Sequence, residues 1–140
     1  MGTGTYSRRV AEGVCVDCAC SLSERAKTRR CPSCQEALNK QNRDLHAKDK
    51  LAAFAAYGGA FCSCCGEKEA AFLTLDHVNG DGGMDRVHIG GKRQARYGGK
   101  WYRRLRWQGY PTDPLLQVLC SNCNLGKHLK GVCPHKEVVR

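Results

Sequence analysis

The stretch "LTLDHVNGDGG", residues 73–83, combines a strand pattern with a glycine-rich turn. Leucine alternates with threonine and aspartate over 73–76, as in a short strand with one buried face. The run 79–83 then ends the strand, because Gly, Asn and Asp readily adopt the backbone conformations of a turn. Asp76 and His77 therefore stand at a strand end. Such a pair can serve one site only if another part of the chain is held beside it.

Two cysteine pairs flank this stretch and predict how that second part is held. Cys62 and Cys65 lie in "CSCCGE", and Cys120 and Cys123 lie in "LCSNC". Each pair has the two-residue spacing of a zinc knuckle, and two knuckles complete a tetrahedron around one ion. Closing the long loop between them costs a few kcal/mol, whereas zinc binding to small fingers contributes roughly 10–16 kcal/mol. We therefore expect a zinc site that brings 120–124 to Asp76-His77, while Cys64 points away from it.

A second set of pairs lies near the N-terminus. "CVDC" contains Cys15 and Cys18, and "CPSC" contains Cys31 and Cys34. This spacing predicts a four-cysteine zinc ribbon. Cys20 is left over, either as a bystander or as a replacement for Cys18.

Composition favours metal sites and a polyanionic partner. The 140 residues include 11 cysteines and only 3 Phe, so we expect a small hydrophobic core that bound zinc ions stabilise. The start, "MGTGTYSRRVAEG", has no apolar signal region, and we expect a cytoplasmic protein whose thiols stay reduced. No segment is apolar enough to span a membrane. The formal charge of +10, reduced to roughly +6 by two zinc–thiolate sites, favours DNA as the partner.

Three helices are expected. Residues 35–57 repeat leucine and alanine every seven positions and predict a linker helix. "SNCNLGKHLKG" predicts a helix that Gly131 ends. "KWYRRLRWQ" predicts another, ended by Gly109, with Trp101 and Leu105 in the core.

A basic insert precedes the second strand. No acidic residue occurs from Arg86 to Thr112, and five aromatic residues are interleaved with the basic ones. We expect phosphate contacts from this stretch; the alternative is a solvated loop. The predicted DNA-binding side chains are Arg86, Lys92, Arg93, Arg96, Lys100, Arg103, Arg104 and Arg106, together with Lys127 of the C-terminal helix.

The combination "YGGAFCSCCGE", "LTLDHVNGDGG" and "YPTDPLLQVLCSNCN" resembles the phage-type HNH endonucleases, also called ββα-metal or His-Me finger nucleases. The resemblance covers about residues 54–130. It implies a small zinc-stabilised α+β fold with a ββα-metal (HNH) core. The expected organisation is a zinc ribbon over 1–34, a linker helix over 35–57, a nuclease core over 58–131 with the insert 84–112, and a tail over 132–140. Cys133 and His135 fall in that tail, although they could form a stray ligand pair.

The resemblance also implies roles for individual residues. His77 would be the general base that activates water, and Asp76 and Asn124 would bind Mg²⁺ or Mn²⁺. The position of the family's middle Asn is Leu115 here. His88 or Asn79 would then orient the His77 ring instead.

We therefore expect a metal-dependent DNA endonuclease or nickase that leaves 5′-phosphate and 3′-hydroxyl ends. The resemblance implies that a phage or mobile element encodes the chain, as is the case for homing endonucleases. We expect the chain to act on DNA in the host cell, as a monomer or a homodimer. One alternative is a zinc-ribbon nucleic-acid-binding protein that does not cut. Another is an accessory nuclease that depends on phage packaging proteins.

Overall fold

The computed structural model describes residues 3–24, 26–80 and 99–136, and the chain divides into two compact units, Met1–Asp44 and Leu45–Arg140. The N-terminal unit begins with helix α1 (Thr3–Ala11), which was not predicted from the sequence. A loop follows, closed by a bridge between Val14 and Ser21. The Arg9 guanidinium ties α1 to this loop by donating to the Val16 carbonyl at 2.8 Å.

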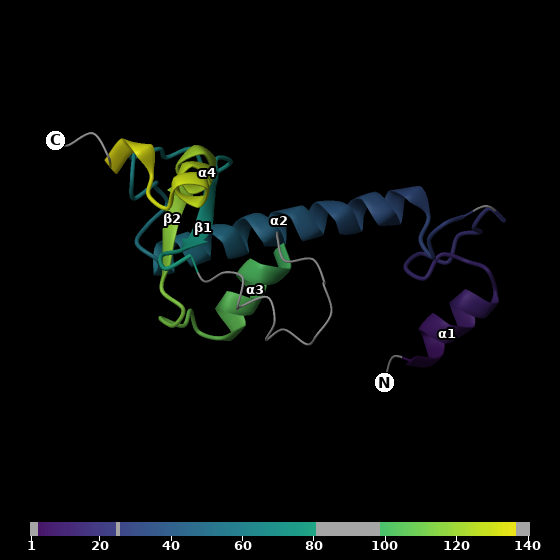
Figure 1. The fold of residues 1–140 in the computed structure, drawn as a ribbon. Helices are drawn as coiled ribbons and strands as arrows, with labels where there is room; N and C mark the ends of the chain where they lie inside the picture. The colour runs from purple at the N-terminus through teal and green to yellow at the C-terminus, as the bar shows by residue number, and fades with distance from the viewer. Residues whose placement is uncertain (1–2, 25, 81–98, 137–140) are drawn as a thin grey trace. The chain divides into compact units, whose positions relative to one another are not determined.

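Helix α2 (Pro32–Ala56) corresponds to the helix predicted over 35–57 and runs from one unit into the other (Figure 1). It begins at Pro32 because proline, which lacks an N–H, costs nothing at the first helical position. Its C-terminal half buries Asp49, Ala53 and Phe54 in the second unit. The C-terminal end of α2 is thus part of the core, whereas its first half is largely exposed.

The second unit is built on two strands and a helix. Strand β1 (Leu73–His77) pairs antiparallel with β2 (Leu116–Cys120), with Leu73 opposite Cys120 and His77 opposite Leu116. Helix α4 (Ser121–Lys130) follows β2 directly and packs against both strands (Figure 1). It ends at Gly131, as predicted, where φ is 80° and the N–H donates to the Lys127 carbonyl.

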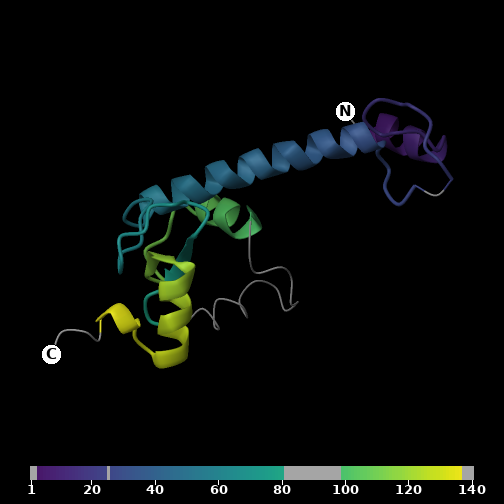
Figure 2. The ribbon, with the colours of Figure 1, turned by 90° about the horizontal axis from the view of Figure 1, so that it is seen from above.

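Two shorter elements complete this unit. Helix α3 (Gly99–Trp107) lies beside the C-terminal half of α2 (Figure 2), where Tyr102 packs edge-on against Phe54. After α4 a single 3-10 turn, η2 (Pro134–Lys136), packs back against that helix. The C-terminal stretch was expected to be a tail, but its described part is packed and Cys133 is buried.

One core unites these elements. It contains side chains of α2, β1, α3 and β2 together with several cysteines, and Leu75, Leu105, Val118 and Leu119 are among its buried residues. Tyr102 is buried there, while Trp101 is only half-buried at its edge. Two strands are barely stable alone, so this sheet depends on the helices and on the cysteine clusters described below.

The chain is therefore a small α+β protein with a two-stranded sheet and clustered cysteines, as the sequence predicted. Within the described ranges, no helix combines the length and the apolar character that a membrane span requires.

Candidate metal centres and the Asp76–His77 site

The first cysteine cluster lies in the N-terminal unit. The sulfurs of Cys15, Cys18, Cys31 and Cys34 all lie within 4.8 Å of one another. Cys18 Sγ and Cys31 Sγ are 3.6 Å apart, close to the S···S edge of about 3.8 Å that Zn–S bonds of about 2.3 Å give in a tetrahedron. Cys20 Sγ lies 3.4 Å from Cys18 Sγ but is not a member of the cluster. The group fits a zinc ion.

The second cluster contains the four cysteines that the spacing predicted: Cys62, Cys65, Cys120 and Cys123. Cys65 Sγ and Cys120 Sγ are 3.7 Å apart. Gly66, with φ of 80°, forms the turn of the first knuckle, and its N–H donates to the Cys62 carbonyl. In the second knuckle the Cys120 sulfur caps α4 by accepting from the Cys123 N–H. The cluster joins the loop before β1 to the start of α4, as expected.

Each cluster combines a thiol with a lowered pKa and a thiol with a raised pKa, and the thiolate is the form that binds metal. The hydrogen bond with Cys31 raises the pKa of Cys34, and burial raises the pKa of Cys123. The Ser33 hydroxyl beside Cys31 is the largest of several causes that lower the pKa of that thiol to about 5. Burial raises the pKa of Cys62, but backbone N–H groups, led by that of Cys65, outweigh it and lower the pKa to about 6.

A third group contains Cys133 and His135, which the sequence left open as a stray ligand pair, together with two cysteines that were not predicted to join them. Cys64, Cys123, Cys133 and His135 also place their ligand atoms within 4.8 Å of one another. Cys64 is not a member of the second cluster, as expected, and its sulfur lies with these partners instead. The group shares Cys123 with the second cluster, and the sequence offers only the weak signal of a cysteine and a histidine two residues apart.

Asp76 lies on the face of β1 that meets α4. Its Oδ2 accepts a hydrogen bond from Gln117 Nε2 at 2.8 Å and forms an ion pair with Lys127 Nζ at 2.6 Å. The side chains of Asp76 and Lys127 are only 13% and 17% exposed, so this pair is largely shielded from water. Gln117 stands directly opposite Asp76 in the strand register and was missed as a site residue. Pairing "LTLDH" with "LQVLC" in antiparallel register would have found it.

His77 lies on the opposite face of β1, towards α3. Its ring stacks on Trp101 with centroids 6.0 Å apart and planes 17° from parallel. Its carbonyl accepts from Lys127 Nζ at 2.5 Å and from the Gly80 N–H at 3.0 Å. Lys127 therefore contacts both members of the Asp-His pair, one through its side chain and the other through its backbone.

Of the remaining predicted catalytic residues, only some lie near Asp76 and His77 in the described part of the chain. Asn124 precedes Lys127 by three residues, so it lies on the same side of α4, one turn nearer the helix start. Asn79 is exposed in the turn after β1, and His88 lies outside the described residues. Leu115, the position of the family's middle Asn, is exposed and pairs through its carbonyl with the Val78 N–H.

The predicted DNA-binding residues divide into three sets. Arg86, Lys92, Arg93 and Arg96 lie outside the described part of the chain. Lys100 is exposed and Arg104 is half-buried on α3. Arg103 and Arg106, however, pair with the fully buried Asp49 of α2, at 3.4 and 3.0 Å. These two arginines neutralise a buried carboxylate, a role that composition could not reveal.

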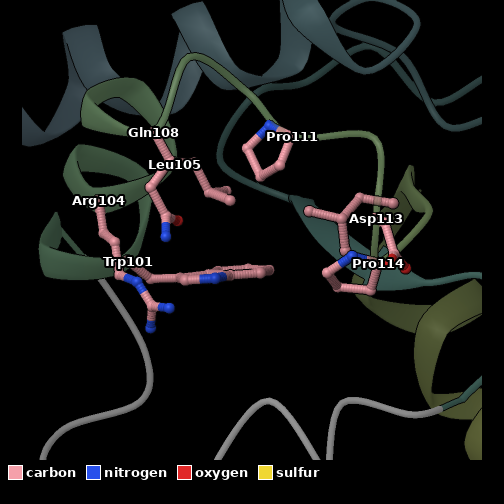
Figure 3. A pocket seen from close by; sticks show the side chains of 8 residues that line it. Trp101, Arg104, Leu105, Gln108, Pro111, Asp113 and Pro114 are labelled. Carbon is pink, nitrogen blue, oxygen red and sulfur yellow. The ribbon is translucent and has the colours of Figure 1, made fainter. Parts of the chain in front are cut away.

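A pocket of about 340 Å³ opens beside Trp101 (Figure 3). Trp101 and Arg104 of α3 and Gln108 just after that helix line one side, and Pro111, Asp113 and Pro114 line the other. The indole ring extends from α3 towards Pro114 (Figure 3). Since the same ring stacks on His77, the pocket lies next to the Asp76–His77 site.

Comparison with known proteins identified no relative: no family model, no curated protein and no solved structure matches this chain.

Proposed function

We propose that this chain is a metal-dependent DNA endonuclease or nickase of the HNH type. The observation that carries the proposal is the arrangement of β1, β2 and α4 around Asp76 and His77. Lys127 of α4 reaches the Asp76 carboxylate and the His77 carbonyl, so the helix and the strand end form one site. The "LDH" and "LCSNCN" motifs that resemble the HNH family thus come from segments that meet in space.

Each side chain has a role that its position supports. His77, held against Trp101, would take a proton from the attacking water. Asp76 and Asn124 offer the carboxylate and amide oxygens that Mg²⁺ prefers, and one ion would need few protein ligands because it keeps several waters. When bound, the ion would neutralise charge that develops on the phosphate and the leaving oxygen. Gln117 fixes the orientation of the Asp76 carboxylate by donating to Oδ2.

The contact between Lys127 and Asp76 favours a second candidate function. A lysine ammonium 2.6 Å from the carboxylate already supplies a positive charge where the cation would sit. If that pair persists on DNA, the protein is a nucleic-acid-binding module without cleavage. If the protein is a nuclease, Lys127 must shift or share Asp76 with the ion, and its ammonium can then contact a phosphate.

The test is nicking of supercoiled plasmid by the purified full chain with and without Mg²⁺. We expect His77→Ala to lose on the order of 10²–10⁴-fold in rate while DNA binding and zinc content stay unchanged. His128→Ala, which removes an exposed histidine of α4, is the matched control and should cut like the wild type. Omitting Mg²⁺ is preferable to adding a chelator, because a chelator would also strip zinc from the cysteine clusters.

Two outcomes would overturn the proposal. Equal nicking by the wild type and His77→Ala would show that another site or a contaminant cuts the plasmid. Binding of DNA without nicking, in Mg²⁺ and in Mn²⁺, would instead support the binding module in which Lys127 neutralises Asp76.

A further inference from the structure

We propose that the second unit binds two zinc ions as one cluster in which both ions share the Cys123 thiolate. The first ion would be held by Cys62, Cys65, Cys120 and Cys123, and the second by Cys64, Cys123, Cys133 and His135. This proposal does not depend on DNA cleavage, since it concerns only the ligands and the metal content.

The distances within the third group fit a tetrahedral zinc site. Cys123 Sγ lies 3.3 Å from His135 Nδ1, and Cys133 Sγ lies 3.5 Å from the same nitrogen. A tetrahedral zinc ion with Zn–S bonds of about 2.3 Å and a Zn–N bond of about 2.0–2.1 Å separates sulfur from nitrogen by roughly 3.6 Å. Both contacts converge on Nδ1, so His135 would bind through that atom.

The chain path after α4 brings these ligands together. Gly131 ends the helix with a positive φ, and the Lys136 N–H then donates to the Cys133 carbonyl, which closes the turn η2. This turn lies so close to α4 that a Cβ on Gly126 would come within 2.8 Å of the Pro134 ring. Pro134 separates the two ligands of the turn, and Cys123 lies one helical turn before Gly126. The close approach therefore seats Cys133 and His135 against Cys123.

Cys64 supplies the last ligand from within the first knuckle. It lies between Cys62 and Cys65, whose sulfurs belong to the second cluster, whereas its own sulfur lies within 4.8 Å of the ligand atoms of Cys133 and His135. With this assignment all six cysteines of residues 45–140 become ligands. Packing alone would not require the sulfurs of Cys64 and Cys133 to lie beside the same imidazole nitrogen.

Sharing one thiolate also limits the charge of the cluster. Six thiolates, one neutral imidazole and two zinc ions leave roughly −2, the same as a single four-cysteine site. The competing explanation is that Cys64, Cys133 and His135 only hydrogen-bond around Cys123 and that one ion occupies the second cluster alone. The two explanations differ by one zinc ion and one bridging sulfur.

Elemental analysis of the full chain tests the number of ions. We expect about three zinc ions per wild-type chain, including one in the N-terminal unit, and about two in a Cys133→Ser/His135→Ala variant. Removing two ligands is necessary because water can replace a single one. His128→Ala is the matched control and should retain about three. Equal zinc content in the wild type and the double variant would overturn the proposal, whatever the total.

Cadmium-113 NMR of the metal-exchanged chain tests the bridge. We expect separate resonances for ions with four sulfur ligands and for one ion with three sulfurs and a nitrogen. Two of the ions should be coupled to each other through the Cys123 sulfur. The nitrogen-ligated resonance and the coupling should both vanish in Cys133→Ser/His135→Ala. A nitrogen-ligated resonance without coupling would show that the ions do not share a thiolate, and would overturn the bridged cluster.

Discussion

Lys127 Nζ lies 2.6 Å from Asp76 Oδ2, and this ion pair joins helix α4 to strand β1. The same ammonium also donates to the His77 carbonyl, so a single side chain fixes both the side chain of one residue and the backbone of the next. Removing one member of a shielded pair leaves the other charge without compensation, which costs more than the pair itself contributes.

We therefore expect Lys127→Met to destabilise the second unit by about 3 kcal/mol. Adding Asp76→Asn should recover part of that loss, which gives a coupling energy of roughly 0.5–3 kcal/mol in a double-mutant cycle. Urea unfolding followed by tryptophan fluorescence measures both, since Trp101 and Trp107 both lie in this unit. Lys130→Met, an exposed lysine of the same helix, should change stability by less than about 0.5 kcal/mol. Strictly additive losses would refute the coupling.

The buried carboxylate of Asp49 predicts a stability role for two arginines. Replacing Arg103 and Arg106 by Met should destabilise the second unit by roughly 3–5 kcal/mol, because Asp49 is left buried without a cation. A further Asp49→Leu change should restore much of the stability. Lys100→Met, an exposed residue of the same helix, is the control for lost charge. Denaturant midpoints that do not differ between the arginine variant and this control would contradict the assignment.

DNA affinity should depend on Lys100 and Arg104, the basic residues of α3 that do not pair with Asp49. Replacing both Lys100 and Arg104 by Ala should reduce the slope of log affinity against log salt by roughly two. Fluorescence anisotropy with a labelled duplex at several salt concentrations measures this slope. Lys136→Ala, in the turn η2, should leave it unchanged. An unaltered slope in the α3 variant would show that this helix faces away from DNA.

The stacking of Trp101 on His77 predicts a positioning role in cleavage, if the proposed function is correct. Trp101→Leu should slow plasmid nicking by roughly tenfold or more because the imidazole loses its aromatic support, whereas Trp101→Phe should retain most of the rate. Trp107 is 75% exposed on the same helix, so Trp107→Leu is the matched control. Equal rates for the Leu and Phe variants at position 101 would argue against this role.

The contact between Gly126 and Pro134 links helix α4 to the third ligand group. Gly126→Ala should raise helix propensity by about 1 kcal/mol, but the new methyl group meets a rigid ring and should displace the turn η2. We expect net destabilisation and the loss of about one zinc ion per chain. Combining it with Pro134→Ala, which removes the ring, should restore the metal. Full zinc content in Gly126→Ala would show that the turn tolerates the displacement.

Features that depend on local spacing could be predicted from the sequence. Two residues between cysteines are enough to form a knuckle, and both predicted groups of four sulfurs are found within 4.8 Å. Alternating leucines predicted β1, and Gly131 and Gly109 mark helix ends because each adopts a positive φ there. The expected roles of Asp76, His77 and Asn124 stay predictions, because they rest on a resemblance that only activity measurements can test.

Which distant groups meet depends on tertiary packing and could not be predicted. Arg103 and Arg106 look like DNA ligands in a basic sequence, yet the packing of α3 against α2 directs them to Asp49. Strand register places Gln117 opposite Asp76, and the docking of α4 adds Lys127. The turn after Gly131 brings Cys133 and His135 back to Cys123. Such contacts depend on how whole elements pack around one core, which no short stretch of sequence encodes.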